Sequence, residues 1–272
     1  TAGGKVLTAT QDPVDGEAYR LAELGYLDDQ NSPFQNIIVD DVTSASTAKA
    51  EAAVAKAINI AIKAMKAGEM DKALQSYAEV IKLQPDHGEA YAQIAYILIG
   101  QGQHDGARKH LKQQLEIGYR PDLAYYNFAC CDALTGNLDA AVQNLSGALS
   151  VGFADANLMS TDTDLNALHG MRSFDAAVQL CKILGAKLKV IESAEGAERF
   201  EALKVAAQIA SKKGDLYRDL GMAYHMQGDY KNSLQAWKQQ AALKFEPGLA
   251  TYNIGCALAR LGKADAAIDS LM

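Results

Sequence analysis

One short segment of the chain, Asp162-Thr163-Asp164-Leu165-Asn166, carries side chains that could bind a cation. Oxygen-bearing side chains at alternate positions open the loops that wrap calcium. The rest of such a loop is missing, because Ala167 stands where a glycine is needed and Ser173 where a bidentate glutamate is needed. Capping of a helix that starts near Leu165 by the side-chain oxygens of Thr161 to Asp164 explains the same pattern more simply. We therefore predict a helix cap and no metal site.

The cysteines are the next candidates for chemistry. Cys130 and Cys131 are adjacent, and neighbours on a helix point about 100° apart, so they cannot form an unstrained disulfide while helical. With Cys181 and Cys256 they also lack the dense, even spacing of a disulfide scaffold. We interpret all four as small, buried apolar residues.

The known sequence signatures of catalysis and cofactor binding are absent. The five histidines form no HExxH motif and have no closely spaced His or Cys that would complete a metal site. The chain also contains no GxGxxG, GxxxxGK[ST] or GxSxG sequence. We predict that it is not an enzyme and takes no cofactor.

Composition narrows the class of protein further. With 272 residues, 49% of them hydrophobic, the chain can bury a sizeable core. A net charge of −7 argues against a nucleic-acid surface, which needs clustered basic residues. No apolar run is long enough to span a bilayer. The first residue is Thr1, which fits a removed leader or a fragment, so an exported and a cytoplasmic protein both stay open.

The elements that position these residues follow from an internal repeat. Gly68, Gly102 and Gly136 lie 34 residues apart. The same spacing relates two series of alanines, Ala61, Ala95 and Ala129, and Ala73, Ala107 and Ala141. Each unit has an apolar helical stretch, a glycine turn and a second helical stretch, which predicts a helix hairpin.

The repeat divides the chain into four parts. Residues 51–155 hold three units, and 214–272 hold two more, the last incomplete, with Gly228 and Gly262 again 34 apart. Residues 156–213 break the period, and we predict a degenerate unit there followed by a connecting helix over Ala197–Lys213. Residues 1–50 do not repeat and form a separate extension.

Two stretches resemble the tetratricopeptide repeat family. They are Tyr217–Tyr224 followed by Gly228–Tyr230, and Tyr125–Ala129 followed by Gly136 and Asn137. The resemblance implies an all-α, right-handed superhelical solenoid that acts as a protein–protein interaction scaffold. The residues before the repeats predict a short irregular, β-rich extension.

In this family the first helices of successive units line a concave groove that binds a peptide or protein segment. The resemblance places eight candidate partner-binding residues there: Asn59, Gln93, Tyr96, Tyr126, Asn127, Arg218, Tyr252 and Asn253. The asparagines recur in register, and an amide can pair with a ligand backbone. Ile58, Ile62, Gln93, Leu123 and Asn127 occupy the places of the basic cluster with which some family members grip a terminal carboxylate, so that ligand is not expected.

An alternative function is self-assembly. The extension is predicted to be β-rich over Lys5–Thr10 and Asn36–Thr43 and helical over Glu17–Leu27. The last unit is short and leaves apolar residues such as Ile268 and Leu271 to be covered by another copy, with Lys5, Val6 and Leu7 as candidates for the contacting arm. Such a head-to-tail contact gives an oligomer or a filament.

Overall fold

The computed structural model describes residues 41–271, with side chains from residue 48 onward. The chain divides into two units, residues 1–52 and residues 53–272. We describe the second unit by itself. The predicted strand over Lys5–Thr10 and helix over Glu17–Leu27 lie outside the described residues.

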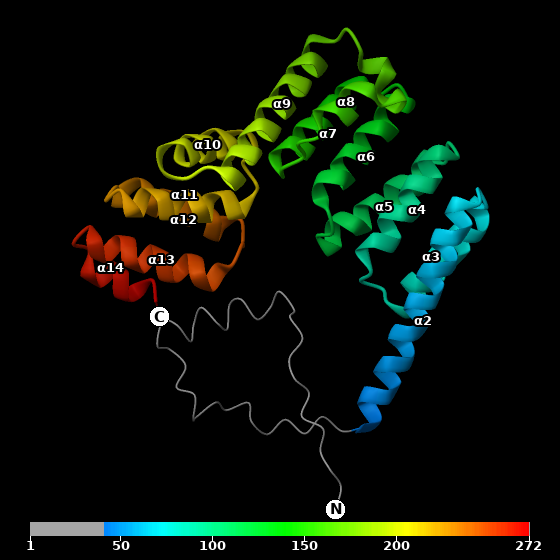
Figure 1. Cartoon of the computed structure of the whole chain (residues 1–272), viewed down its shortest axis with the longest axis horizontal. Helices are drawn as coiled ribbons and strands as arrows, with labels where there is room; N and C mark the ends of the chain where they lie inside the picture. The colour runs from blue at the N-terminus through cyan, green and yellow to red at the C-terminus, as the bar shows by residue number, and fades with distance from the viewer. Residues whose placement is uncertain (1–40, 272) are drawn as a thin grey trace, which may run out of the picture. The chain divides into compact units, whose positions relative to one another are not determined.

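The second unit consists of helices that follow one another in chain order (Figure 1). Helix α2 (Asp41–Lys66) enters it and pairs with α3 (Met70–Leu83). The next two hairpins are α4 (Gly88–Gly100) with α5 (His104–Ile117), and α6 (Pro121–Leu134) with α7 (Leu138–Ser150). The last two are α11 (Gly214–Met226) with α12 (Tyr230–Ala242), and α13 (Pro247–Arg260) with α14 (Ala264–Asp269).

The segment between these groups has a different plan. Two very short helices come first, α8 (Ala156–Thr161) and the 3₁₀-helix η1 (Thr163–Leu168). They pack against α9 (Arg172–Ser193) and against α6, respectively. The longer α9 then pairs with α10 (Gly196–Ile209), which leads into α11.

The repeated glycines mark the turns inside the hairpins. Gly68, Gly102, Gly136, Gly228 and Gly262 all have φ between 72° and 79°. A Cβ added at any of them would meet nothing within 4 Å, so the left-handed backbone, and not a lack of room, requires glycine. After Gly102, for example, the Gln103 amide donates to the Leu98 carbonyl at 2.8 Å, which is the hydrogen bond that closes a helix end of the Schellman type.

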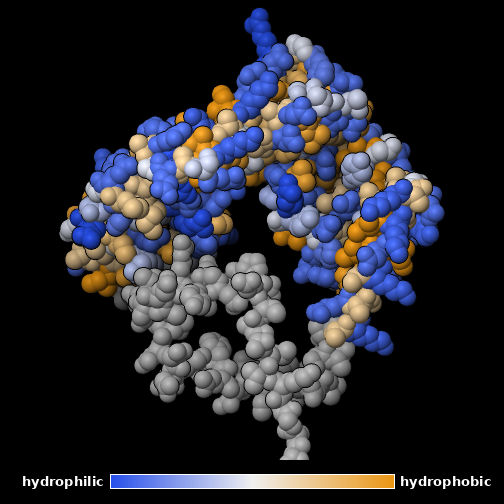
Figure 2. All heavy atoms as spheres, in the orientation of Figure 1, coloured by the Kyte–Doolittle hydropathy of each residue, from blue (hydrophilic) through white to orange (hydrophobic). Residues whose placement is uncertain are grey.

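The repeated alanines form the centre of the core. All six members of the two series, Ala61, Ala73, Ala95, Ala107, Ala129 and Ala141, are fully buried. Large side chains fill the spaces around them, with Leu111, Leu145 and Trp237 almost completely covered. Figure 2 shows mostly hydrophilic residues on the visible face of the helices, with hydrophobic ones between them.

One local arrangement occurs twice, 126 residues apart. A Cβ at Gly88 would lie 2.2 Å from the Tyr119 side chain, and one at Gly214 would lie 2.3 Å from Phe245. In each copy a buried glutamine ties the loop down: Gln114 Nε2 donates to the Tyr119 carbonyl at 3.1 Å, and Gln240 Nε2 to the Phe245 carbonyl at 3.2 Å. The loop before α6 and the loop before α13 are therefore built alike.

The structure confirms the predicted all-α solenoid of helix hairpins. The predicted strand over Asn36–Thr43 is wrong in its described part, because Asp41–Thr43 is already the first turn of α2. The β-branched residues Val42 and Thr43 suggested a strand, but the alanine-rich sequence that follows continues the helix to Lys66. Within residues 41–271, no helix is long and apolar enough to cross a membrane.

Candidate functional site

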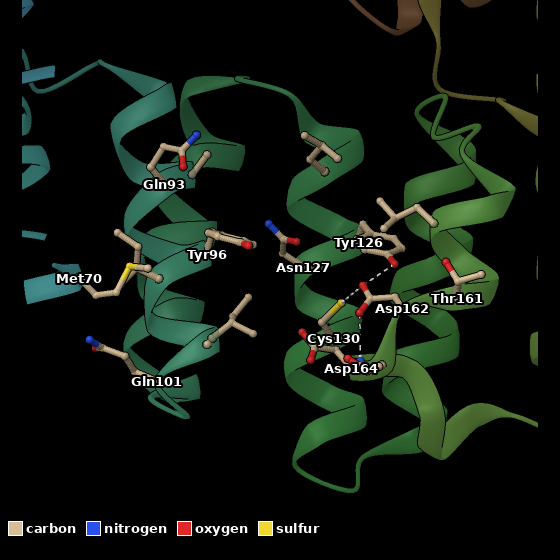
Figure 3. Close-up of a pocket in the computed structure, with 17 residues that line it drawn as sticks. Met70, Gln93, Tyr96, Gln101, Tyr126, Asn127, Cys130, Thr161, Asp162 and Asp164 are labelled. Carbon is tan, nitrogen blue, oxygen red and sulfur yellow. Dashed lines mark hydrogen bonds between the residues drawn. The ribbon is translucent and has the colours of Figure 1, made fainter. Parts of the chain in front are cut away.

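A pocket of the second unit lies between the first helices of two neighbouring hairpins, α4 and α6, with η1 at one side (Figure 3). Its volume is about 920 Å³, which is enough for several residues of a partner chain. Alanine, glycine and large apolar side chains make up much of its wall, among them Met70, Ile97, Leu123 and Leu158.

Amide and phenol groups stand on this apolar wall. Gln93 and Tyr96 come from α4 and Asn127 from α6, and Figure 3 shows Tyr96 and Asn127 extending toward each other across the pocket. Tyr96 is 62% exposed, so its ring offers both an apolar face and a polar tip to a ligand. Four of the predicted partner-binding residues, these three and Tyr126, are thus brought together in one pocket.

Tyr126 has a more structural place in the pocket than the sequence suggested. Its side chain is 3% exposed and stacks on Phe153 at a ring-centroid distance of 4.6 Å. Its hydroxyl donates to Asp162 Oδ2 at 2.7 Å. Burial, and then this hydrogen bond, raise the pKa of Tyr126 far above its ordinary value. The phenol therefore stays protonated and holds η1 against α6.

The other end of the pocket is acidic. Asp162 and Asp164 both line it, and Asp162 also accepts from the Cys130 thiol at 3.8 Å. Burial and the neighbouring Asp162 carboxylate raise the pKa of Asp164. Burial and the two aspartates also raise the pKa of the Cys130 thiol strongly, which makes it a poor nucleophile.

The predicted helix cap at this segment is confirmed. Asp162 is the N-cap of η1, and its Oδ1 accepts from the Asp164 amide at 3.0 Å. Sequence reasoning missed that Cys130, from α6, joins the two aspartates: one ligand atom from each of the three lies within 4.8 Å of the others. These are the residues that could contact a cation, and no spacing in the sequence links position 130 to position 162.

A second, smaller pocket of about 420 Å³ adjoins the first, and both include Leu123 and Leu158 in their walls. Its charged residues are Arg120, Asp122 and Asp155. Arg120 is already paired, because its Nε and Nη2 donate to the two Asp122 oxygens at 3.0 and 2.9 Å.

The remaining predicted partner-binding residues lie away from these pockets. Asn59 is exposed on α2, and Tyr252 is 51% exposed on α13. Arg218 is held by carboxylates, donating to Asp219 at 2.9 Å and to Glu246 at 3.3 Å. Asn253 is 6% exposed, which leaves little of it available to a ligand.

The self-assembly candidates divide in two. Ile268 and Leu271 are 57% and 58% exposed. Lys5, Val6 and Leu7 lie outside the described residues. The proposed contact between the two sets therefore stays a prediction.

Three of the four cysteines have the places predicted for small, buried apolar residues. All four are free thiols; Cys130, Cys131 and Cys181 are buried, whereas Cys256 is only partly buried, so the prediction is wrong for Cys256. Cys131 belongs to the core shared with α4 and α5, whereas Cys130 belongs to the core shared with η1. The two adjacent side chains therefore serve different interfaces.

A family model described as "Tetratricopeptide repeat" matches residues 64–127, a stretch that runs from the last turn of α2 into α6. Over these residues the chain matches the tetratricopeptide repeat family. The matched residues include all of α4 and the first half of α6, two of the helices that line the larger pocket. A comparison with curated protein sequences found no significant match.

Several solved structures are similar to this repeat protein at low identity. A MamA protein is 16% identical, with 80% of this chain and 87% of that chain covered and a TM-score of 0.30. MamA residues 41–end from Desulfovibrio magneticus RS-1 are also 16% identical, covering 71% and 95%, with a TM-score of 0.38. The tetratricopeptide domain of P58(IPK) is 16% identical, covering 80% of this chain and 58% of that chain, with a TM-score of 0.37. These scores are too low to carry an argument about function.

Proposed function

We propose that the pocket between α4 and α6 binds an extended segment of a partner protein. Tetratricopeptide arrays are in general scaffolds for protein–protein interaction, and the first helices of their units form the binding surface. The observation that carries the proposal is the convergence of Gln93, Tyr96 and Asn127 on one open, largely apolar pocket of about 920 Å³.

The pocket's chemistry suits a peptide backbone. Asn127 and Gln93 each carry a donor and an acceptor, as a peptide unit does, so each can pair with one peptide group of the ligand. The apolar wall at Leu123 and Ile97 gives the ligand's side chains a surface to cover. Repeat scaffolds of this kind are generally not enzymes, and the proposal includes no catalytic step; the absence of catalysis stays a prediction.

The test is selection from a display library of random short peptides, followed by binding measurements on the enriched sequences by fluorescence anisotropy. Replacing Asn127 with Ala removes two hydrogen-bonding groups from the pocket, and we expect affinity to fall about tenfold. The matched control is Asn59→Ala, because Asn59 holds the equivalent repeat position on α2 but is exposed and outside the pocket.

The proposal requires the two variants to differ. Enriched peptides that bind Asn127→Ala as tightly as the unchanged protein would place the binding surface elsewhere. Circular dichroism of both variants should match that of the unchanged protein, since neither side chain forms part of the buried core.

A further inference from the structure

The two adjoining pockets carry an excess of negative charge. Asp162 and Asp164 line the larger pocket, and Asp122 and Asp155 line the smaller one. Of the residues that line the larger pocket, none is Lys, Arg or His. The one cation of the smaller pocket, Arg120, is already paired with Asp122. Three carboxylates therefore face the pockets without an ion-pair partner among the described residues that line them.

Two of these three carboxylates are partly buried, which makes their charge significant, whereas Asp155 is exposed. Asp162 and Asp164 lie beside Cys130, which is 2% exposed. The raised pKa of Asp164 shows that burial and the adjacent carboxylate disfavour its charged form. A cation in the pocket would relieve both effects, whereas an acidic ligand would add to them.

The spacing of the two acidic sites sets the spacing of the charges on a ligand. Asp122 and Cys130 are eight residues apart on α6, which corresponds to about 12 Å along the helix axis. Asp155 and Asp162 flank α8 and are seven residues apart, or about 10 Å by the same rise. An extended chain covers that distance in about three to four residues.

We infer that the partner segment is basic, with two Lys or Arg residues three or four positions apart, one at Asp162 and Asp164 and the other at Asp155. Between them the segment crosses Leu123 and Leu158, which both pockets share, so an apolar residue between the two basic ones fits best. This inference rests on the proposed function and specifies its ligand.

The experiment uses synthetic peptides with an apolar residue between two lysines. In one peptide the lysines are about four positions apart, matching the acidic sites. In a second they are adjacent, and in a third both are replaced by glutamate. Affinity for the full chain is measured by fluorescence anisotropy at low and at moderate salt.

Two substitutions test the acidic sites. Asp164→Asn removes one charge from the larger pocket, and Asp155→Asn removes one from the smaller pocket while keeping a side chain that caps α8 equally well. We expect each to weaken the spaced-lysine peptide about tenfold and to reduce its salt dependence. Asp139→Asn is the control, since Asp139 is exposed on α7 and belongs to neither pocket.

The outcomes separate this inference from the proposed function. Peptides whose affinity falls in Asn127→Ala but not in Asp164→Asn or Asp155→Asn would overturn the inference of a basic ligand. The proposed binding site would then still hold. Lysine peptides that bind Asn127→Ala undiminished would overturn the proposed function. A third outcome is that a divalent cation abolishes peptide binding and a chelator restores it. This would show that the carboxylates and Cys130 bind a metal ion, and it would overturn the inference.

Discussion

Helices α6 and α13 carry the same signature but give it different surroundings. Tyr126, Asn127 and Cys130 on α6 correspond to Tyr252, Asn253 and Cys256 on α13, each 126 residues later. On α6 the tyrosine is 3% exposed, whereas on α13 it is 51% exposed. The asparagines are reversed: Asn127 stands half-buried in the pocket, while Asn253 is 6% exposed and its Nδ2 has no hydrogen-bond partner within the described part of the chain.

The difference comes from what packs against each helix. Helix η1 lies on α6 and brings Asp162 to the Tyr126 hydroxyl. The described residues place no such segment on α13. The repeat signature thus fixes where a side chain stands on its helix, and the neighbouring, non-repeated segment decides whether it serves the core or a ligand.

The thiols give the largest expected contrast. Cys130 is buried beside two aspartates that, with burial, raise its pKa, whereas Cys256 is partly exposed. Burial also raises the pKa of Cys131 to about 11 and that of Cys181 to about 12. Because the thiolate is the reacting form, we expect iodoacetamide at neutral pH to modify Cys256 more than about a hundredfold faster than the other three.

Peptide mass spectrometry over a time course measures this ranking. The control is the chain unfolded in guanidinium, in which all four cysteines should react at similar rates. Early labelling of Cys130 in the folded protein would contradict the packing of η1 on α6.

A second contrast concerns the volume of the core. In the first copy Ala95 is fully buried near Leu111, and the equivalent positions of the second copy hold Gly221 and Trp237. A Cβ at Gly221 would lie 2.3 Å from Trp237 Nε1. We expect Gly221→Ala to reduce the free energy of unfolding by about 1–3 kcal/mol through overpacking, as measured by urea unfolding.

The double variant Gly221→Ala with Trp237→Leu makes this comparison sharper, because it copies the Ala95 and Leu111 pair into the second site. It should cost less than the sum of the two single changes, since the smaller Leu leaves room for the added methyl group. If the loss of unfolding free energy in the double variant equals the sum of the two single losses, residues 221 and 237 do not pack against each other as Ala95 and Leu111 are expected to.

Much of the fold could be predicted because its signals are local and periodic. Gly102 needs a left-handed turn, and Ala95 and Ala107 need to be small, and each requirement returns after 34 residues. The candidate site could be predicted only in part. Gln93, Tyr96 and Asn127 follow the repeat, but the acidic end depends on residues with no repeat equivalent.

Asp162 shows why the acidic end of the pocket could not be predicted from the sequence. The sequence indicates that Asp162 caps η1, because that contact joins residues only two positions apart. Its contacts with Tyr126 and Cys130 join positions 36 and 32 residues apart, across a segment that breaks the period. Only the packing of η1 on α6 reveals that the cap residue also forms the wall of a pocket.

The smallest predicted effect tests that packing directly. Tyr126→Phe removes the hydroxyl that donates to Asp162 and leaves a partly buried carboxylate with one fewer donor, so we expect a loss of about 1–2 kcal/mol in the free energy of unfolding. Tyr96→Phe is the matched control, because Tyr96 is 62% exposed in the same pocket and should change stability by less than about 0.5 kcal/mol. Urea unfolding of both variants measures the difference. Equal stability in the two variants would mean that the hydrogen bond contributes nothing to holding η1 on α6. The stacking of Tyr126 on Phe153 would then be sufficient to explain why this tyrosine is buried while Tyr252 on α13 is exposed.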